Sequence, residues 1–244
     1  MAHKTRKRLT KTELKKDPIN EALMKGMYYL QDHLKQLIAV GVGILVAILV
    51  IQSISSNSAQ QANRSMAEYY LASQLYTMGV SNIINYGDFD SGVGQLQAAQ
   101  QMARNVYRNY PGRIAGKRAL ILSAKVSIMF GMNSEVVSEL QEFLASDPEK
   151  ELKQAARIHL AIALENRGGT TDYEAAREIY NDILASTEED SHLAFEAYSG
   201  LSRIMYQRNE LEGSLENLER AMAIATDTTD FMEYQLTRLE LSMN

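Results

Sequence analysis

Few side chains in this sequence have both the type and the spacing that chemistry needs. Asp190, Ser191 and His192 are the residue types of a catalytic triad, but a triad is assembled by the fold, and adjacency in the chain argues against one. There is no cysteine, which excludes disulfides, zinc–thiolate sites and thiol nucleophiles. The four histidines lack the spacing of metal ligands; they are His3, His33, His159 and His192.

A partial likeness to a phosphate-binding loop occurs at residues 112–118. Gly112 and Gly116 precede Lys117, but the spacing is one residue short, no Ser or Thr follows the lysine, and no strand precedes the loop. The acidic run Glu188–Asp190 is typical of a solvated turn. We therefore expect a protein that is not an enzyme and that has no catalytic site, cofactor or metal.

Charge divides the chain into two parts. Residues 1–36 carry nine Lys/Arg against four Asp/Glu, a net charge of +5, whereas the rest carries -10. An acidic chain of this kind is a poor candidate for nonspecific nucleic-acid binding, so we expect no nucleic-acid partner. The basic arm, residues 1–16, is expected to contact anionic membrane lipid, with RNA as the alternative.

The element that separates these parts is an apolar run of fifteen residues, Leu37–Ile51. A membrane span needs about 20 residues, and the flanks extend the run, so residues 37–54 are predicted to form a transmembrane helix. A buried core helix and a cleaved signal peptide, cut at Asn57–Ala59, are the alternatives. Because 36 residues precede the run, we favour an uncleaved anchor. Only Arg64 is basic in the twenty residues after the span, which predicts a cytoplasmic N-terminus and a periplasmic C-terminal domain.

Two further features concern the membrane region. Asp17 and Pro18 start an amphipathic helix, residues 17–36, which is expected to lie on the membrane surface or against a partner; a solvated lead-in to the anchor is the alternative. Within the span, small residues recur every four positions and predict contact with another membrane helix. These residues are Ala39, Gly43 and Ala47.

Beyond a linker or helix continuation at residues 55–61, the region 62–244 is predicted to be a helical repeat array. Its first helix shows apolar residues at alternating spacings of four and three from Ala62 to Ile83, and a loop is expected at residues 85–94. Gly131 and Pro148 then bracket a helix with three apolar residues on one face, at positions 136, 140 and 143.

Similar helix pairs follow this one. One pair starts near Gln154 and turns at Gly168, another starts near Phe195 and turns at Asn209, and residues 230–243 form a final helix. An earlier second helix ends near Pro111. The expected fold class is all-α: an amphipathic helix, one transmembrane helix and a stack of helical hairpins that bury one another's apolar faces.

The hairpins resemble degenerate tetratricopeptide units, in which a turn glycine precedes the second helix and a proline follows it. No tryptophan opens any unit, and the glycine usual inside the first helix is replaced by Ala124, Ala161 and Ser202. The whole layout, from Leu34 to the C-terminus, resembles the YfgM-type ancillary subunit of the bacterial Sec translocon. The resemblance implies a non-catalytic inner-membrane protein whose periplasmic repeats bind protein partners or emerging chains.

A tetratricopeptide array binds its ligands on the concave face, through defined positions of each first helix. Carried over by this resemblance, the partner-binding residues are Arg118, Ile121, Lys125 and Met129, then Ile158, Ile162, Glu165 and Asn166, then Ser199, Arg203, Tyr206 and Gln207. Packing between the units is the alternative role for some of them. Clustered cations in an acidic domain predict an acidic or C-terminal carboxylate ligand.

Two hypotheses follow for the function. The first is a membrane-anchored interaction module for protein partners, and the alternative is a structural subunit of a larger inner-membrane assembly.

Overall fold

A computed structural model describes residues 34–188, 190–225 and 230–243 of the protein. Every regular element in these ranges is an α-helix, which confirms the predicted all-α class. The helices are α2 (Leu34–Tyr86), α3 (Phe89–Asn109), α4 (Ile114–Met129), α5 (Asn133–Ala145), α6 (Lys150–Arg167), α7 (Thr170–Ser186), α8 (His192–Gln207), α9 (Leu211–Ile224) and α10 (Asp230–Met243). The chain divides into two compact units, Met1–Gln61 and Ala62–Asn244.

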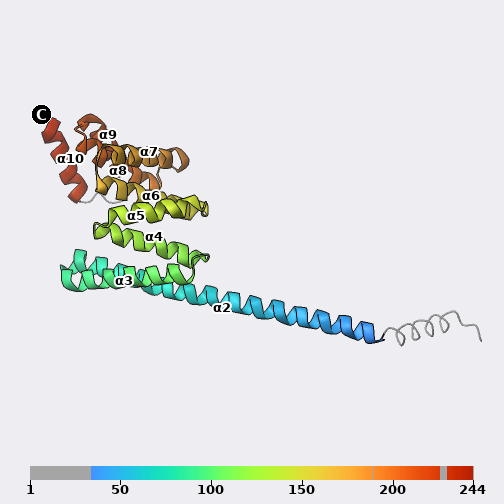
Figure 1. Ribbon diagram of the computed structural model, residues 1–244. Coiled ribbons are helices and arrows are strands. Elements are labelled where there is room, and N and C mark those ends of the chain that lie inside the picture. The colour runs from blue at the N-terminus through green and yellow to red at the C-terminus, as the bar shows by residue number, and fades with distance from the viewer. Residues whose placement is uncertain (1–33, 189, 226–229, 244) are drawn as a thin grey trace, which may run out of the picture. The chain divides into compact units, whose positions relative to one another are not determined.

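In the second unit, neighbouring helices pack as successive hairpins from α3 to α10 (Figure 1). Helices α4, α6 and α8 are each the first helix of a hairpin. Helix α4 contacts α6, and α6 contacts α8. We call α4, α6 and α8 the first helices. This arrangement is an array of stacked helical hairpins, consistent with an α-solenoid and compatible with a tetratricopeptide-like fold.

The helix ends follow local sequence signals. Asp88 caps α3 by accepting a hydrogen bond from the Ser91 backbone N–H at 3.1 Å, and Ser191 caps α8 by accepting one from the Ala194 backbone N–H at 3.2 Å. Gly131 has φ +75° in the turn between α4 and α5, a conformation that other residues rarely adopt. These signals fix where each hairpin reverses.

The core is built from the apolar faces that the sequence periodicity predicts. Val136 and Leu140 on α5 are fully buried, and Phe143 is 5% exposed. The largest buried side chain is Tyr180 on α7, among the described residues. Many other core positions are alanines, which let adjacent helices approach closely; they include Ala99, Ala103, Ala119, Ala124, Ala156, Ala161, Ala176 and Ala197.

The turn between α2 and α3 is shorter than the loop expected at residues 85–94. Helix α3 already begins at Phe89, because Asp88 acts as its N-cap. Gly92 lies inside this helix and packs against α2: a Cβ there would stand 2.4 Å from Ile83 Cγ1 and 2.8 Å from the Gly79 carbonyl oxygen. The glycine serves close helix packing rather than a turn.

Helix α2 includes residues 55–61, so this segment continues the helix instead of forming a linker. Among the described residues, none of the helices contains a stretch both long enough and apolar enough to cross a membrane. Of the predicted span 37–54, however, only Ile44, Ile48 and Gln52 have described side chains. The side chains of Ala39, Gly43 and Ala47, the basic arm and nearly all of the amphipathic helix lie outside the described residues, so those expectations remain predictions.

Candidate functional site

The residues predicted to bind a partner occupy the first helices, but they differ widely in exposure. Ile121 and Ile158 are 9% and 5% exposed and belong to the core, so they are not on the surface that a partner would meet. Ile162 is partly buried against the same core. Met129 is about half exposed, and Asn166 and Gln207 are exposed. The prediction was wrong for these two isoleucines because both lie on the face of their helix that packs into the hydrophobic core.

The cations of the predicted surface also have different surroundings. Lys125 Nζ lies 4.9 Å from the centre of the Tyr76 ring on α2, so its charge rests on an aromatic face. Arg203 on α8 is bound to a carboxylate. None of the ion pairs between described side chains includes Arg118, which is partly buried. The three cations therefore do not form one cluster of free positive charge.

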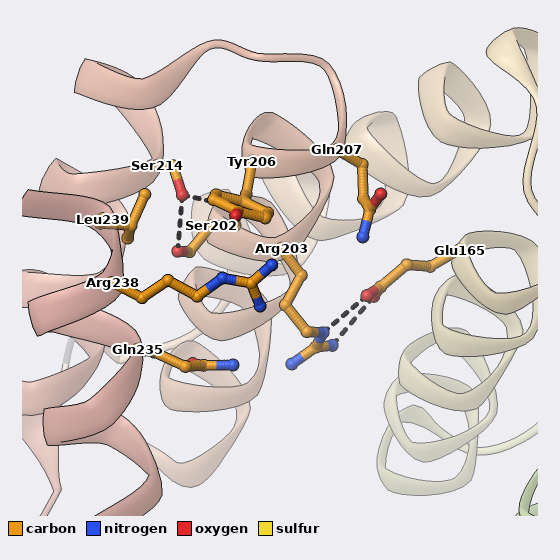
Figure 2. A pocket seen from close by; sticks show the side chains of 9 residues that line it. All are labelled: Glu165, Ser202, Arg203, Tyr206, Gln207, Ser214, Gln235, Arg238 and Leu239. Atoms are coloured by element: carbon orange, nitrogen blue, oxygen red, sulfur yellow. Dashed lines mark hydrogen bonds and ion pairs between the residues drawn. The ribbon is translucent and has the colours of Figure 1, made fainter. Parts of the chain in front are cut away.

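The predicted residues of α6 and α8 do meet in a pocket of about 200 Å³. Helix α8 contributes four residues to its lining, α6 one, α9 one and α10 three (Figure 2). The lining residues are Glu165, Ser202, Arg203, Tyr206, Gln207, Ser214, Gln235, Arg238 and Leu239. We call this cavity the α8 pocket.

One wall of the α8 pocket is a bidentate ion pair between α6 and α8. Arg203 Nε and Nη2 donate to the two oxygens of Glu165, at 2.6 and 2.9 Å. The hydroxyl of Tyr180 on α7 donates to Glu165 Oε2 at 3.0 Å. Glu165 is 10% exposed and Arg203 is 37% exposed, so the carboxylate is buried while the guanidinium reaches the pocket. This pair links two neighbouring first helices.

Burial and this hydrogen-bond network shift two pKa values. Burial raises the pKa of Tyr180 well above its ordinary value, and the neighbouring Glu165 charge raises it further. Burial lowers the pKa of Arg203, but the hydrogen bonds and charge of Glu165 outweigh that effect, so the net pKa lies above the ordinary arginine value. Tyr180 therefore remains a neutral donor and Arg203 a permanent cation.

The Tyr180 ring can pack against α8 and reach Glu165 because residue 200 is a glycine. A Cβ at Gly200 would stand 2.2 Å from Tyr180 Cζ and 2.7 Å from its hydroxyl oxygen. No heavier residue fits without moving a fully buried ring. The glycine thus positions the donor that supports Glu165.

The rest of the lining comes from α8, α9 and α10. The guanidinium carbon of Arg238 lies 5.0 Å from the centre of the Tyr206 ring. The Ser202 and Ser214 hydroxyls lie 3.2 Å apart, and Ser214 Oγ donates to the Ser202 carbonyl oxygen at 2.8 Å. Figure 2 shows Gln235 and Arg238 projecting from α10 towards Arg203. Sequence reasoning missed the α10 residues, because it treated this helix only as the end of the stack.

The other motifs noted in the sequence have local roles. Ser191 Oγ caps α8 and donates to the Glu188 carbonyl oxygen at 2.7 Å, while His192 stacks on Phe195. Lys117 Nζ binds both carboxylate oxygens of Glu149 at 2.9 Å. No group of three His, Cys, Asp or Glu side chains within the described ranges is placed to hold a metal ion.

The α8 pocket therefore offers hydrogen-bond donors: two guanidinium groups, two amides and a phenol. Its one carboxylate is already engaged by Arg203. Such a lining suits a ligand that presents hydrogen-bond acceptors. Comparison with family models, with characterised proteins and with solved structures finds no match for this chain.

Proposed function

We propose that this chain is a non-catalytic protein-interaction module, anchored in the bacterial inner membrane, which presents its tetratricopeptide-like array on the periplasmic side. The α8 pocket is the observation that carries the proposal, because it gathers donors from several helices into one recess. Its partners are protein chains, among them exported proteins, in line with the resemblance to an ancillary Sec translocon subunit. In this view the module assists secretion or chaperones exported chains.

Membrane anchoring rests on the apolar run Leu37–Ile51 within α2. Ile44 and Ile48 are 57% and 55% exposed on this helix, an arrangement that lipid favours and water does not. The positive charge before the run favours a cytoplasmic N-terminus. An alkaline phosphatase fused to the C-terminus should be active in a bacterial host, whereas activity of a cytoplasmic reporter there would overturn this topology.

Retention of the anchor is a separate part of the proposal. The intact mass of membrane-purified protein should correspond to the full chain. A mature N-terminus near Gln60 would instead identify Asn57–Ala59 as a cleavage site and exclude a permanent anchor.

The interaction function is tested with the full chain, solubilised in mild detergent and used as bait, followed by mass spectrometry. Substoichiometric capture of several exported proteins is the expected result for an interaction module. Failure to capture any protein, with or without crosslinking, would overturn the proposal.

A second candidate, a structural subunit of a larger inner-membrane assembly, is favoured by exposed apolar side chains near the start of the array. Large apolar side chains that a folded domain leaves exposed are candidates for burial against another protein. The residues are Tyr70, Leu71, Met78, Ile84, Tyr86 and Phe89. Stoichiometric co-purification of other membrane subunits, lost in a combined Leu71→Ser and Met78→Ser variant, would favour this candidate over the first.

A further inference from the structure

We propose that the α8 pocket binds a carboxylate of the protein partner, held between Arg203 and Arg238. This inference rests on the proposed interaction function and names the chemical group that the pocket selects. The carboxylate comes from a chain terminus or from an acidic side chain, and the experiment below separates these two sources.

The pocket already contains an example of the chemistry. Arg203 binds the Glu165 carboxylate through Nε and Nη2, in the parallel geometry that makes guanidinium–carboxylate pairs specific. Its third nitrogen, Nη1, has no such partner among the described residues. Since Arg203 lines the pocket, this nitrogen remains for an incoming acceptor.

Arg238 supplies the second guanidinium from α10. Eight arginines of the described array form ion pairs with acidic side chains, and Arg238 is not among them. It rests on the Tyr206 ring, which orients it without neutralising its charge. Among the described side chains no carboxylate forms an ion pair with Arg238, although the domain carries 16 Lys/Arg against 26 Asp/Glu.

The charge balance and the neutral donors favour the same ligand. Two arginines and one glutamate leave the pocket with a net charge of +1, which matches one carboxylate. The amides of Gln207 and Gln235 line the same space and can donate to the remaining lone pairs of the ligand. A volume of about 200 Å³ accommodates an acidic side chain or a terminal residue, but not a folded domain.

The experiment uses the immobilised full chain in detergent and four N-acetylated heptapeptide mixtures, quantified by mass spectrometry. One mixture has a free C-terminal carboxylate. The other three are C-terminally amidated and carry at the centre a neutral residue, a glutamate or a phosphoserine. We expect roughly tenfold greater retention of one or both carboxylate mixtures than of the neutral mixture. This is the gain in affinity that one charge-assisted hydrogen bond provides. The free-terminus and glutamate mixtures identify the source of the carboxylate.

Substitutions test whether the peptides bind in the α8 pocket. Arg238→Gln should lower this retention roughly tenfold, and Arg238→Lys should lower it less, because it keeps the charge but loses the planar fork. Arg108→Gln, on the exposed surface of α3, is the matched control and should have no effect. Equal loss in the Arg108 and Arg238 variants would overturn the proposal.

Two other results would also overturn it: equal retention of all mixtures, or preferential retention of the phosphoserine mixture. If partner proteins are captured by the full chain but no carboxylate mixture is retained, the carboxylate inference fails while the interaction function stands. If carboxylate peptides bind but the full chain captures no protein, the pocket binds carboxylates and the proposed interaction function fails.

Discussion

Helix α6 contacts its two neighbouring first helices in opposite ways. Towards α8 it presents Glu165, whose carboxylate is paired with Arg203 and hydrogen-bonded by Tyr180. Towards α4 it presents His159, whose surroundings include a like charge, Lys125. Burial lowers the pKa of His159 to about 4, with Lys125 as the second cause, so the imidazole is neutral at pH 7.

The contrast shows that similar hairpins can contact one another through different kinds of interaction, an ion pair in one case and a buried neutral imidazole in the other. The α6–α8 junction depends on a charged pair and is therefore expected to respond to salt and to loss of either partner. The α4–α6 junction contains His159, whose charged form is disfavoured by burial, and it is therefore expected to respond to acid. Because repeat arrays open locally, each junction can be perturbed without the other.

The largest effect should come from Gly200→Ala. The new Cβ would collide with the Tyr180 ring and displace the hydroxyl that supports Glu165. Overpacking of this kind should cost about 3 kcal/mol of unfolding free energy. Hydrogen exchange of the full chain should show faster exchange in α6–α8 than in α3–α5.

The matched control for this variant is Gly94→Ala on α3, where a Cβ would meet no atom within 4 Å. It should leave stability unchanged or raise it by about 0.5–1 kcal/mol, because alanine favours the helix. Equal destabilisation by the two variants would show that Gly200 is not a site of close packing.

Glu165→Gln should have the next largest effect. It removes the charge that Arg203 and Tyr180 share, but Arg203 keeps access to water, so we expect a loss of only about 1–2 kcal/mol, smaller at high salt. Chemical denaturation at low and high salt measures this change. Glu216→Gln is the control, since the Glu216–Arg220 pair is more than half exposed on both sides and should contribute almost nothing.

The fold followed from the sequence wherever a local signal was decisive. Apolar spacing identified the buried faces at Val136, Leu140 and Phe143, and Gly131 identified a turn. The length of the turn between α2 and α3 was not predictable, because an aspartate such as Asp88 is equally common in a turn and at a helix N-cap. Local propensity cannot separate these two roles when the distinguishing contact is the packing of Gly92 on Gly79.

The candidate site was only partly predictable, since it depends on how the helices rotate against one another. Arg203, Tyr206 and Gln207 were placed on the interacting surface, and they line the α8 pocket. The pairing of Arg203 with Glu165, 38 residues away, was not predicted, because periodicity gives the face of a helix but not its neighbour. Arg238 reaches the pocket from α10, and nothing in its local sequence indicates that.

The α4–α6 junction gives the third prediction, a loss of stability in mild acid. The folded pKa of His159 is depressed to about 4, so between that value and its ordinary value near 6.5 the unfolded chain binds more protons. Stability should therefore fall as the pH drops from about 6.5 towards 4, by about 1–2 kcal/mol at pH 5. Denaturation of the wild-type chain and of His159→Gln at pH 7 and pH 5 measures this difference.

The variant is expected to lose most of the stability change between these two pH values. The carboxyl groups with depressed pKa values, among them Asp88, Asp147 and Asp172, are protonated only below this window. A pH dependence that persists in His159→Gln would assign it to another group.

The smallest expected effect concerns Lys125, the like charge near His159. Lys125→Met removes this charge and also the contact with the Tyr76 ring, which at an exposed site is worth about 0.5–1 kcal/mol. The pKa of His159 should rise but stay below its ordinary value, because burial is the larger cause of the shift. An NMR titration of the imidazole signals, assigned with His159→Gln, measures this pKa. Arg118→Met, on the same helix, should leave the pKa unchanged, and an equal change in both variants would mean that α4 acts through its overall charge rather than through Lys125.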